Sequence, residues 1–292
     1  MKTLPRLALA ALCWLPSACN SADSGPATGA VLPWVIQDTG WRSDAAWYDG
    51  KAEKSVYAAA RSIYGVERNY LALAYTNKQA MDPRSTTKSA DGTGIEVFKH
   101  HWSERIETEN YDYDYSTASF TTSDRFQPFK LTVGTQEDCG TSFKQVWREA
   151  NRLRSFESVY FPDAGMRSGQ LEREDIVFED ALPLVLRDFP FGQADAHELW
   201  VVPSQKSTKR VPFAPELRRV VARGEERLEL PIGELLSQRL DLMDASGSEL
   251  LASYWFASDG SAPLLHVLVR YQGAGGESYA LQSHVRTAYW ER

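Results

Sequence analysis

The stretch of sequence that most constrains the fold is residues 238–289, where alternating segments are separated by turn residues. Within the segments, apolar side chains recur at every second position, which is typical of strands with one buried face. The clusters Asp244-Ala245-Ser246-Gly247, Ser258-Asp259-Gly260 and Gly273-Ala274-Gly275-Gly276 are typical of tight reversals. This region therefore predicts an antiparallel meander with strands at 239–243, 250–256, 264–271 and 279–289.

The sequence before the meander also favours strands. Alternation or β-prone composition predicts them at 51–64, 67–76, 111–115, 116–123, 129–134, 198–202, 217–222 and 226–231, with a long polar loop at 81–94. Two segments remain open: 95–109 fits a helix or a strand, and 142–161 fits a helix or two strands.

The best helix candidate is 171–186, where Ile176, Leu182 and Leu184 form part of an apolar stripe and acidic residues lie near the start. Pro183 should break this helix. We therefore predict a mainly β protein, with one or two helices packed against a large antiparallel sheet.

The N-terminus has the features of an export signal. A short basic start precedes the apolar run 7–15, which is shorter than the roughly 20 residues that span a bilayer. The run ends in Leu15-Pro16-Ser17-Ala18-Cys19, which resembles the lipobox of bacterial lipoproteins, although Pro16 stands where that motif usually has an aliphatic residue. The resemblance implies a signal peptide over 1–18 and lipidation of Cys19; an ordinary signal cleaved near Ala27-Thr28-Gly29 is the alternative.

Residues 19–30 are small and polar and predict a flexible tether. The body, 31–292, is predicted to be a single β-rich domain, or two sheet halves at 31–165 and 166–292. Lipid on Cys19 would make the protein exported and membrane-anchored on the periplasmic or outer side of the cell envelope.

The charge of the body disfavours nucleic acid as a partner. Without Lys2 and Arg6, 30 basic residues stand against 39 acidic ones, a net charge of about −9, whereas nucleic-acid binding needs a clustered basic surface. The basic groups at 206–210 and 218–219 are expected to be solvated loop or strand faces.

One cysteine is a candidate nucleophile. Cys13 lies in the signal and Cys19 would carry lipid, so Cys139 is left without a disulfide partner. With His100 or His101 as its base, Cys139 would make the protein a cysteine-dependent hydrolase or transferase. The competing interpretation is a buried cysteine that acts as a small hydrophobe.

The sequence predicts neither a metal site nor a cofactor. His100 and His101 are adjacent and diverge in a strand or a helix, so they fit one ion poorly even with Glu104 nearby. Alternating Tyr and Asp at 111–115 does not supply the compact set of oxygens that calcium needs. His266 and His284 are expected on the less apolar face of strands, and no phosphate-binding, dinucleotide-binding or hydrolase motif occurs.

Aromatic residues are frequent and partly paired, as in Trp255-Phe256 and Tyr289-Trp290. They fit the core of a large β protein, or a concave sheet face that holds an apolar ligand.

Short motifs resemble a group of uncharacterised bacterial envelope lipoproteins, many of which carry the label septum formation inhibitor Maf. The motifs are Trp47-Tyr48-Asp49-Gly50-Lys51-Ala52-Glu53, Gln136-Glu137-Asp138-Cys139-Gly140, Glu179-Asp180-Ala181-Leu182-Pro183, Tyr254-Trp255-Phe256 and Arg286-Thr287-Ala288-Tyr289-Trp290. The chain lacks the Ser-x-Ser-x-x-Arg-type motif and the α/β alternation of the Maf nucleotide pyrophosphatases, so the resemblance does not imply their activity.

The meander is also similar to β-rich periplasmic proteins related to lipoprotein-carrier folds. That likeness implies a curved, half-barrel-like sheet with one face to fill. The leading hypothesis is a non-enzymatic, lipid-anchored envelope protein that binds an apolar ligand or a protein partner. The alternatives are the Cys139 enzyme and a structural envelope-assembly component.

Overall fold

The computed structural model describes residue 32 and residues 40–290. The proposed signal peptide, Cys19 and the whole tether lie outside these residues. No helix in the described part is long and apolar enough to cross a bilayer.

The described residues form one continuous, strongly curved sheet of 15 strands, almost entirely antiparallel. Its first half is β1 (Ala52–Ile63), β2 (Val66–Met81), β3 (Ile95–Ile106), β4 (Tyr113–Thr122), β5 (Pro128–Glu137), β6 (Gly140–Glu149), β7 (Arg152–Val159) and β8 (Gly165–Gln170). Its second half is β9 (Val177–Phe178), β10 (Ala196–Val202), β11 (Glu216–Leu230), β12 (Gly233–Asp244), β13 (Leu250–Ala257), β14 (Leu268–Gly273) and β15 (Ser278–Thr287).

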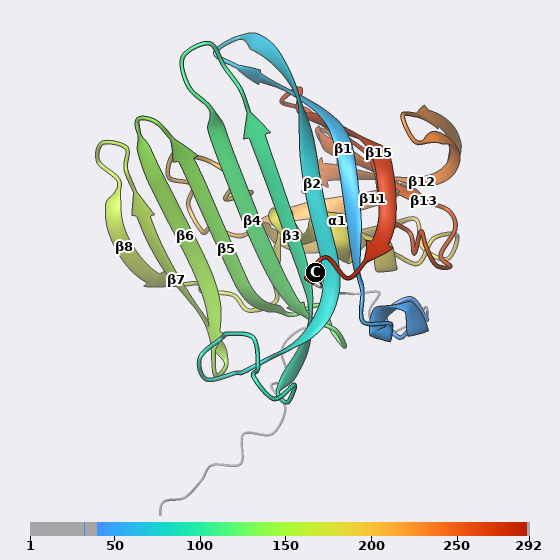
Figure 1. Ribbon diagram of the computed structural model, residues 1–292, viewed down its shortest axis with the longest axis horizontal. Helices are drawn as coiled ribbons and strands as arrows, with labels where there is room; N and C mark the ends of the chain where they lie inside the picture. Colours follow the sequence, from blue (N-terminus) through green and yellow to red (C-terminus); the bar gives the residue numbers. More distant parts are fainter. Residues whose placement is uncertain (1–31, 33–39, 291–292) are drawn as a thin grey trace, which may run out of the picture.

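The first and last strands join the two halves, because β1 pairs with β15. Strand order then runs sequentially outward to β8 at one end of the sheet and to β9 at the other. The sheet bends so that its two halves face each other with α1 (Leu182–Val185) between them, behind β2 and β3 in Figure 1. The mainly β class and the curved antiparallel sheet are therefore confirmed.

The helical segment is much shorter than the sequence predicts. Only η2 (Glu179–Ala181), α1 and η3 (Leu186–Asp188) are helical, and a separate turn, η1 (Ala45–Tyr48), precedes β1. The predicted helix over 171–186 is wrong in its first half because Val177 and Phe178 are extended and pair with β10. Pro183 then occupies the first turn of α1, where its missing N–H costs no hydrogen bond.

Four other expectations are settled or corrected. Residues 95–106 form a strand, and 142–161 contain two strands. The strands predicted at 217–222 and 226–231 are one strand, β11, which continues past a bulge at Gly224, whose φ is +89°. The strand predicted at 264–271 begins only at Leu268, because Leu265 and His266 adopt left-handed φ values of +45° and +54° that interrupt the alternation.

The main core lies inside the curve, where the segment 176–189 packs against both halves of the sheet. A buried ion pair fixes this segment. Arg187 donates two hydrogen bonds to the carboxylate of Glu53 on β1, at 2.7 and 2.8 Å, and its Nε donates to the carbonyl of Leu265 at 2.9 Å. The guanidinium lies 4.9 Å from the ring of Trp41 and 5.5 Å from that of Trp47.

Two of the motifs that carry the sequence resemblance, 47–53 and 286–290, meet at this cluster. Arg286 from the end of β15 pairs with Asp49 at 2.9 Å and lies 5.5 Å from the ring of Trp47, while Arg187 and Glu53 pair beside them. Segments distant in sequence thus converge on one structural cluster at the joint between the two halves of the sheet.

The space between the two ends of the sheet is closed by a loop rather than by a strand. Lys144 on β6 is buried, and its ammonium donates to the carbonyls of Gln205, Ser207 and Lys209 at 3.0, 3.1 and 2.7 Å. Ser142 adds a hydrogen bond to the carbonyl of Thr208 at 2.8 Å. Residues 203–210 are thereby held across the inner face of β6 and β7.

Candidate functional site

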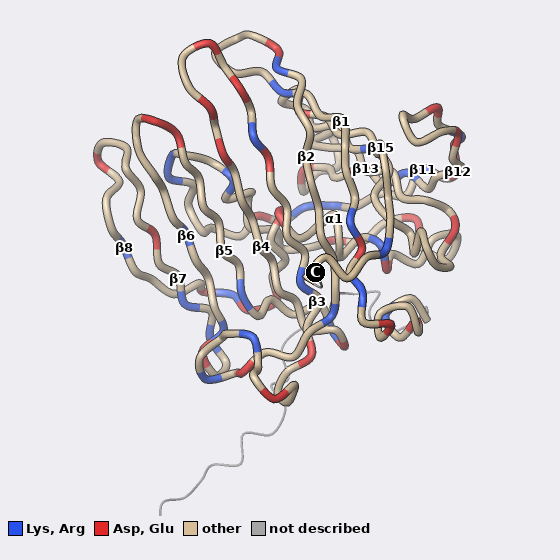
Figure 2. The backbone as a smooth tube through the Cα atoms, in the orientation of Figure 1, with Lys and Arg blue, Asp and Glu red and all other residues tan. Residues whose placement is uncertain are grey.

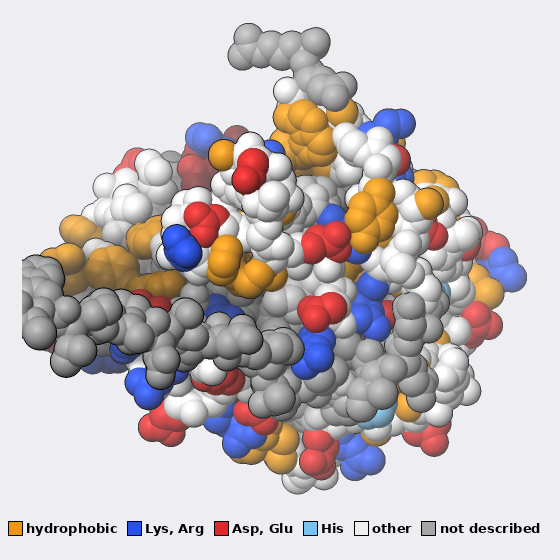
Figure 3. Space-filling model, turned by 90° about the horizontal axis from the view of Figure 1, so that it is seen from below, with side chains coloured by type: hydrophobic (Ala, Val, Ile, Leu, Met, Phe, Trp, Pro, Cys, Tyr) orange, Lys and Arg blue, Asp and Glu red, His pale blue; other side chains and the backbone are white. Residues whose placement is uncertain are grey.

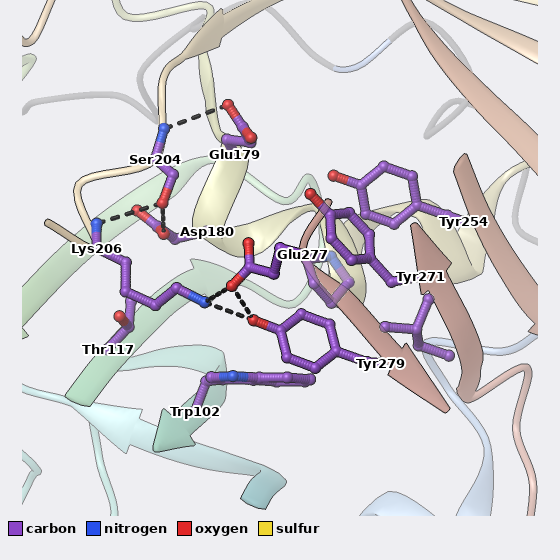
Figure 4. A pocket seen from close by; sticks show the side chains of 12 residues that line it. Trp102, Thr117, Glu179, Asp180, Ser204, Lys206, Tyr254, Tyr271, Glu277 and Tyr279 are labelled. Carbon is purple, nitrogen blue, oxygen red and sulfur yellow. Dashed lines mark hydrogen bonds and ion pairs between the residues drawn. The ribbon is translucent and has the colours of Figure 1, made fainter. Parts of the chain in front are cut away.

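A small cavity of about 70 Å³ lies inside the curve, beside the start of the helical segment (Figure 4). Strands β3, β4, β13, β14 and β15, the helical segment and the loop after β10 all contribute to it. Its lining comprises Trp102, Thr117, Glu179, Asp180, Pro183, Ser204, Lys206, Tyr254, Leu268, Tyr271, Glu277 and Tyr279.

One wall of the cavity is an ion-pair network centred on Lys206. Its ammonium lies 2.7 Å from a carboxylate oxygen of Glu104, 2.9 Å from one of Glu277 and 2.7 Å from the hydroxyl of Tyr279. Arg61 approaches the same two carboxylates at 3.7 and 3.8 Å. Burial disfavours the charged forms of Glu277 and Lys206. Even so, the charges of Lys206 and Arg61 lower the pKa of Glu277 to about 2. The charges of Glu104 and Glu277 in turn raise the pKa of Lys206.

The opposite wall carries two adjacent acids at the start of the helical segment. Asp180 accepts from the Ser204 hydroxyl at 2.6 Å and from the Gln205 amide at 2.8 Å, and Glu179 accepts from the Ser204 amide at 3.2 Å. Burial raises the pKa of both acids, and for Glu179 the charge of Asp180 adds to the rise.

Aromatic rings line the remaining side. Trp102 packs on Tyr279 with ring centres 4.8 Å apart, Tyr279 on Tyr271 at 5.4 Å, and Tyr271 on Tyr254 at 5.0 Å. The cavity therefore combines acids, hydroxyls and ring faces in a small volume. Ligand pockets for drug-sized molecules are about 300–1,000 Å³, so this space does not fit a lipid.

Lys206 departs from its predicted environment. The basic group 206–210 was expected to be a solvated face, but Lys206 lies inside the curve with its ammonium among Glu104, Glu277 and Tyr279. The network was not predictable from the sequence, because Glu104 is on β3, Lys206 is in a loop, and Glu277 and Tyr279 lie at the start of β15. Most of the residues that form its bonds are more than 70 positions apart.

The structure does not bring Cys139 together with a histidine. Cys139 is exposed in the turn between β5 and β6, so the expectation of a buried thiol is wrong. His101 pairs across β4 with Ala118, which pairs with Thr132 on β5. Cys139 is seven residues beyond Thr132, about 23 Å along the strand, and Thr132 lies two strand spacings from His101, so Cys139 is roughly 25 Å from either candidate base.

The other sequence candidates are held by local contacts. His100 shares a hydrogen bond with the Thr76 hydroxyl at 2.9 Å and His101 with that of Ser116 at 3.0 Å. His284 contacts Ser55 and the Pro263 carbonyl, and His266, which lies before β14 rather than in a strand, contacts the Ala257 carbonyl. Within the described residues, no three His, Cys, Asp or Glu side chains are grouped closely enough to hold a metal ion.

All five histidines of the chain have a pKa lowered mainly by burial, and that of His100 falls to about 3. Above pH 6.5 His100 is neutral in both the folded and the unfolded state. Between pH 6.5 and 3 only the unfolded state gains the proton, so stability is lost as pH falls through this window, by up to about 1.4 kcal/mol per pH unit.

We therefore predict that the unfolding free energy of His100→Asn decreases less between pH 6.5 and 4.5 than that of the unaltered protein. Asparagine keeps a hydrogen-bonding group near Thr76. Chemical denaturation at several pH values measures the difference between the variant and the unaltered protein. The difference is the informative quantity, because the raised pKa values of Glu137, Glu179 and Asp180 stabilise the fold as pH falls. Parallel pH profiles for the two proteins would contradict a neutral buried His100.

A second candidate site lies on the outer face of the sheet. We call Val56, Leu71, Leu73, Tyr75, Val285 and Tyr289 the outer patch. Val56 pairs with Leu73 across β1 and β2, and Lys54 beside them pairs with Tyr75 and Val285. Leu71 is 56 % exposed and Val285 51 %, and Tyr75 packs on Tyr289 with ring centres 4.4 Å apart. A shallow groove of about 550 Å³ runs along part of this patch.

The face seen from below looks different. Seen from below, hydrophobic side chains lie in separate groups among charged ones (Figure 3). Lys, Arg, Asp and Glu are interspersed along the described chain, without a large region of one sign (Figure 2). The outer patch is thus the feature of the described surface that most resembles a protein-binding site.

Comparison with known proteins supports the fold. No protein-family model and no curated protein matches the sequence. A crystal structure of a β-barrel-like protein of a domain of unknown function, DUF1849, from Brucella abortus matches with a TM-score of 0.51 and 8 % sequence identity. The match covers 81 % of this chain and 98 % of that one.

The two proteins share a fold. At 8 % identity, this similarity does not indicate a shared activity, ligand or partner. It fits the predicted β-rich architecture, and no relationship to Maf-labelled lipoproteins or to lipoprotein carriers is shown by it, so those resemblances stay predictions.

Proposed function

We propose that this chain is an exported, lipid-anchored protein of the cell envelope that binds a protein partner through the outer patch and has no enzymatic activity. The N-terminal signal and the lipobox-like Cys19 support export and anchoring. The tether of 19–30 would place the folded body close to a membrane surface without inserting it.

The outer patch is the observation that carries the binding role. Contiguous exposed apolar surface on a folded domain commonly marks an interaction site. Leu71 and Val285 are each more than half exposed, and their neighbours Leu73, Tyr75 and Tyr289 extend the patch across β1, β2 and the end of the chain.

Two other functions are less well supported by the geometry. An apolar ligand would need space inside the curve, but the helical segment and the core leave only small cavities there, one of about 70 Å³ lined largely by acids, hydroxyls and aromatic rings and one of about 120 Å³ beside Phe126 and Val177. Both are well below the roughly 300 Å³ at which ligand pockets begin. A cysteine hydrolase or transferase would need a base beside Cys139, and His100 and His101 lie roughly 25 Å away.

Leu71→Glu tests the patch. A carboxylate at this exposed position should leave stability nearly unchanged, yet it should prevent apolar contact with a partner. We expect the recovery of proteins that co-purify with the full chain from detergent-solubilised envelopes to fall at least tenfold in Leu71→Glu. Met166→Glu, at an exposed position on the edge strand β8, is the matched control and should retain them. Equal recovery by both variants would contradict the proposal.

Cys19→Ser tests the anchor. We expect the unaltered chain to carry an N-terminal lipid by mass spectrometry and to remain with membranes, because a lipidated N-terminus adds membrane affinity for every buried CH₂ group. The variant should lose the lipid and move to the soluble fraction. An unlipidated native chain whose N-terminus lies beyond Cys19 would instead support the ordinary cleaved signal.

A further inference from the structure

A row of basic and aromatic side chains crosses the outer face of strands β3 to β7, which lie side by side in Figure 1. The strand registers pair its five members in the order Lys99, Phe120, Lys130, Trp147 and Arg154. Residues that are directly paired in antiparallel strands point to the same side of the sheet. The residues beside them in sequence, including Phe98, Val146 and Leu153, belong to the main core, so these five lie on the opposite face. We call them the basic row.

The first part of the basic row carries positive charge without acidic partners. Neither Lys99 nor Lys130 forms an ion pair with another described residue, and the Lys130 ammonium donates to the Thr86 carbonyl at 2.9 Å. Burial lowers the pKa of both lysines, and the positive charge of Lys88 lowers that of Lys99 further. Partly buried cations in such surroundings favour an anion beside them.

The other end of the basic row is also positive. Arg152 and Arg154 are alternate residues of β7 and project from the same face. Arg154 pairs with Glu149 at 2.8 Å, whereas Arg152 is exposed and makes no ion pair in the described part of the chain. The one other acid that faces outward from β3 to β7, Asp114, lies opposite Arg105 at the far ends of the strands. The face around the basic row therefore has an excess of positive charge.

The spacing of the cations selects the kind of anion. Neighbouring strands lie about 4.8 Å apart, so Lys99, Lys130 and Arg154, on every second strand, follow one another at about 10 Å. Nucleic-acid phosphates recur at about 3.4 Å along each strand of a duplex, which is too close to match. A polysaccharide with one carboxylate in every second sugar has charges at about the wider interval. Phe120 and Trp147 lie between the cations, and their negative ring faces suit the C–H groups of sugar rings.

Beside the basic row the same face carries small side chains. Ala118 pairs with Thr132 in the next row of the sheet, and a side chain at Gly134, one row further, would meet open space. Phe143, which pairs with Gly134, is 39 % exposed, and its ring centre lies 6.5 Å from that of Phe156. The small residues thus leave a shallow trough along the basic row, with aromatic rings at one end, that has room for an extended polymer.

We propose that the basic row binds an extended acidic polysaccharide with one carboxylate in each disaccharide, laid across strands β3 to β7. Successive carboxylates pair with Lys99, Lys130 and Arg154, and the sugars between them pack on Phe120 and Trp147. The net charge of the whole chain is −7, which disfavours unspecific capture of polyanions, so binding depends on this local excess of positive charge. The proposal goes beyond the partner-binding role of the outer patch and does not depend on it.

Calorimetric titration of the detergent-solubilised full chain with hyaluronan oligosaccharides tests the basic row. Hyaluronan is a linear polysaccharide with one carboxylate in each disaccharide. We expect saturable binding of the hexasaccharide, which supplies three carboxylates, about tenfold weaker binding of the tetrasaccharide, which supplies two, and none of uncharged cellohexaose. Absence of saturation, or equal binding of an oligoglutamate or an oligothymidylate of the same charge, would overturn the proposal.

Single substitutions locate the contacts. Lys99→Gln and Arg154→Gln each remove one cation from a partly exposed position, so each should melt like the unaltered protein and bind the hexasaccharide about tenfold more weakly. Arg227→Gln is the matched control, because it removes a cation that is 65 % exposed on β11, and it should bind like the unaltered protein. Unchanged affinity in Lys99→Gln and Arg154→Gln, or the same weakening in Arg227→Gln, would overturn the assignment of the site.

Discussion

Replacing Arg187 with methionine is expected to lower the free energy of unfolding by about 3–5 kcal/mol, because removal of one partner leaves the other charge of a buried pair uncompensated. Both partners, Arg187 and Glu53, are at most 2 % exposed. The change also removes the donors that Arg187 supplies to the Leu265 carbonyl and the cation between Trp41 and Trp47. Equilibrium denaturation with urea measures the loss.

The pair can be separated from simple loss of volume by a double-mutant cycle. Glu53→Gln combined with Arg187→Met should cost less than the sum of the single changes, since no unpaired charge is left buried. Arg105→Met breaks an exposed ion pair with Asp112 and should leave stability nearly unchanged. A cost for Arg187→Met no greater than that for Arg105→Met would show that the helical segment is not anchored by this pair.

Replacing Lys144 with methionine is the second large effect that we expect. Methionine fills a similar volume, but the carbonyls of Gln205, Ser207 and Lys209 would lose their shared donor. A buried acceptor left without a partner costs about 1–3 kcal/mol. Gln205 is fully buried, whereas Ser207 and Lys209 are partly accessible to water, so a loss on the order of 2 kcal/mol follows. Amide hydrogen exchange should rise specifically over 203–210.

Lys130→Met provides the matched control. Lys130 donates to a single carbonyl, that of Thr86, at 2.9 Å, and it is only partly buried. Lys130→Met should lower the free energy of unfolding by about 1 kcal/mol and leave amide exchange at 203–210 unchanged. Equal losses in the two lysine variants would mean that the loop is held by its other contacts, such as Ser142 with Thr208 and Arg210 with Glu157.

Alternation and turn chemistry were sufficient to predict most of the sheet. The turn at 244–247 forms as predicted because the Asp244 carboxylate accepts from the Ser248 and Glu249 amides at 2.8 and 2.9 Å. Such contacts are local, so the sequence carries them directly.

The errors arose where long-range contacts override local pattern. Residues 264–267 alternate like a strand, but the Leu265 carbonyl accepts from Trp41 at 2.6 Å and from Arg187. Residues 171–178 carry a helical stripe, yet Val177 and Phe178 pair with β10. Neither partner is close in sequence, so periodicity within a window cannot indicate them.

The candidate sites were predictable only in part. The exposed apolar residues of the outer patch lie within predicted strands. Which face of the sheet packs against the core, and which faces solvent, depends on the direction in which the sheet curves. The sequence predicted Lys206 as part of a solvated basic loop. Its contacts with Glu104, Glu277 and Tyr279 arise only because the fold places it inside the curve. Cys139 carried the stronger chemical signal and lies at an exposed turn far from both candidate bases.

Photo-crosslinking in intact cells tests the central claim most directly, namely that this protein acts by binding a protein partner on the outer face of its sheet. A photoreactive amino acid at position 71, in the full chain with Cys19 intact, should give a discrete higher-mass adduct that contains a second protein. The same group at the exposed position 166 on β8 should give none. An adduct at 166 but not at 71, or no adduct at 71 while the chain is folded and membrane-associated, would contradict the account.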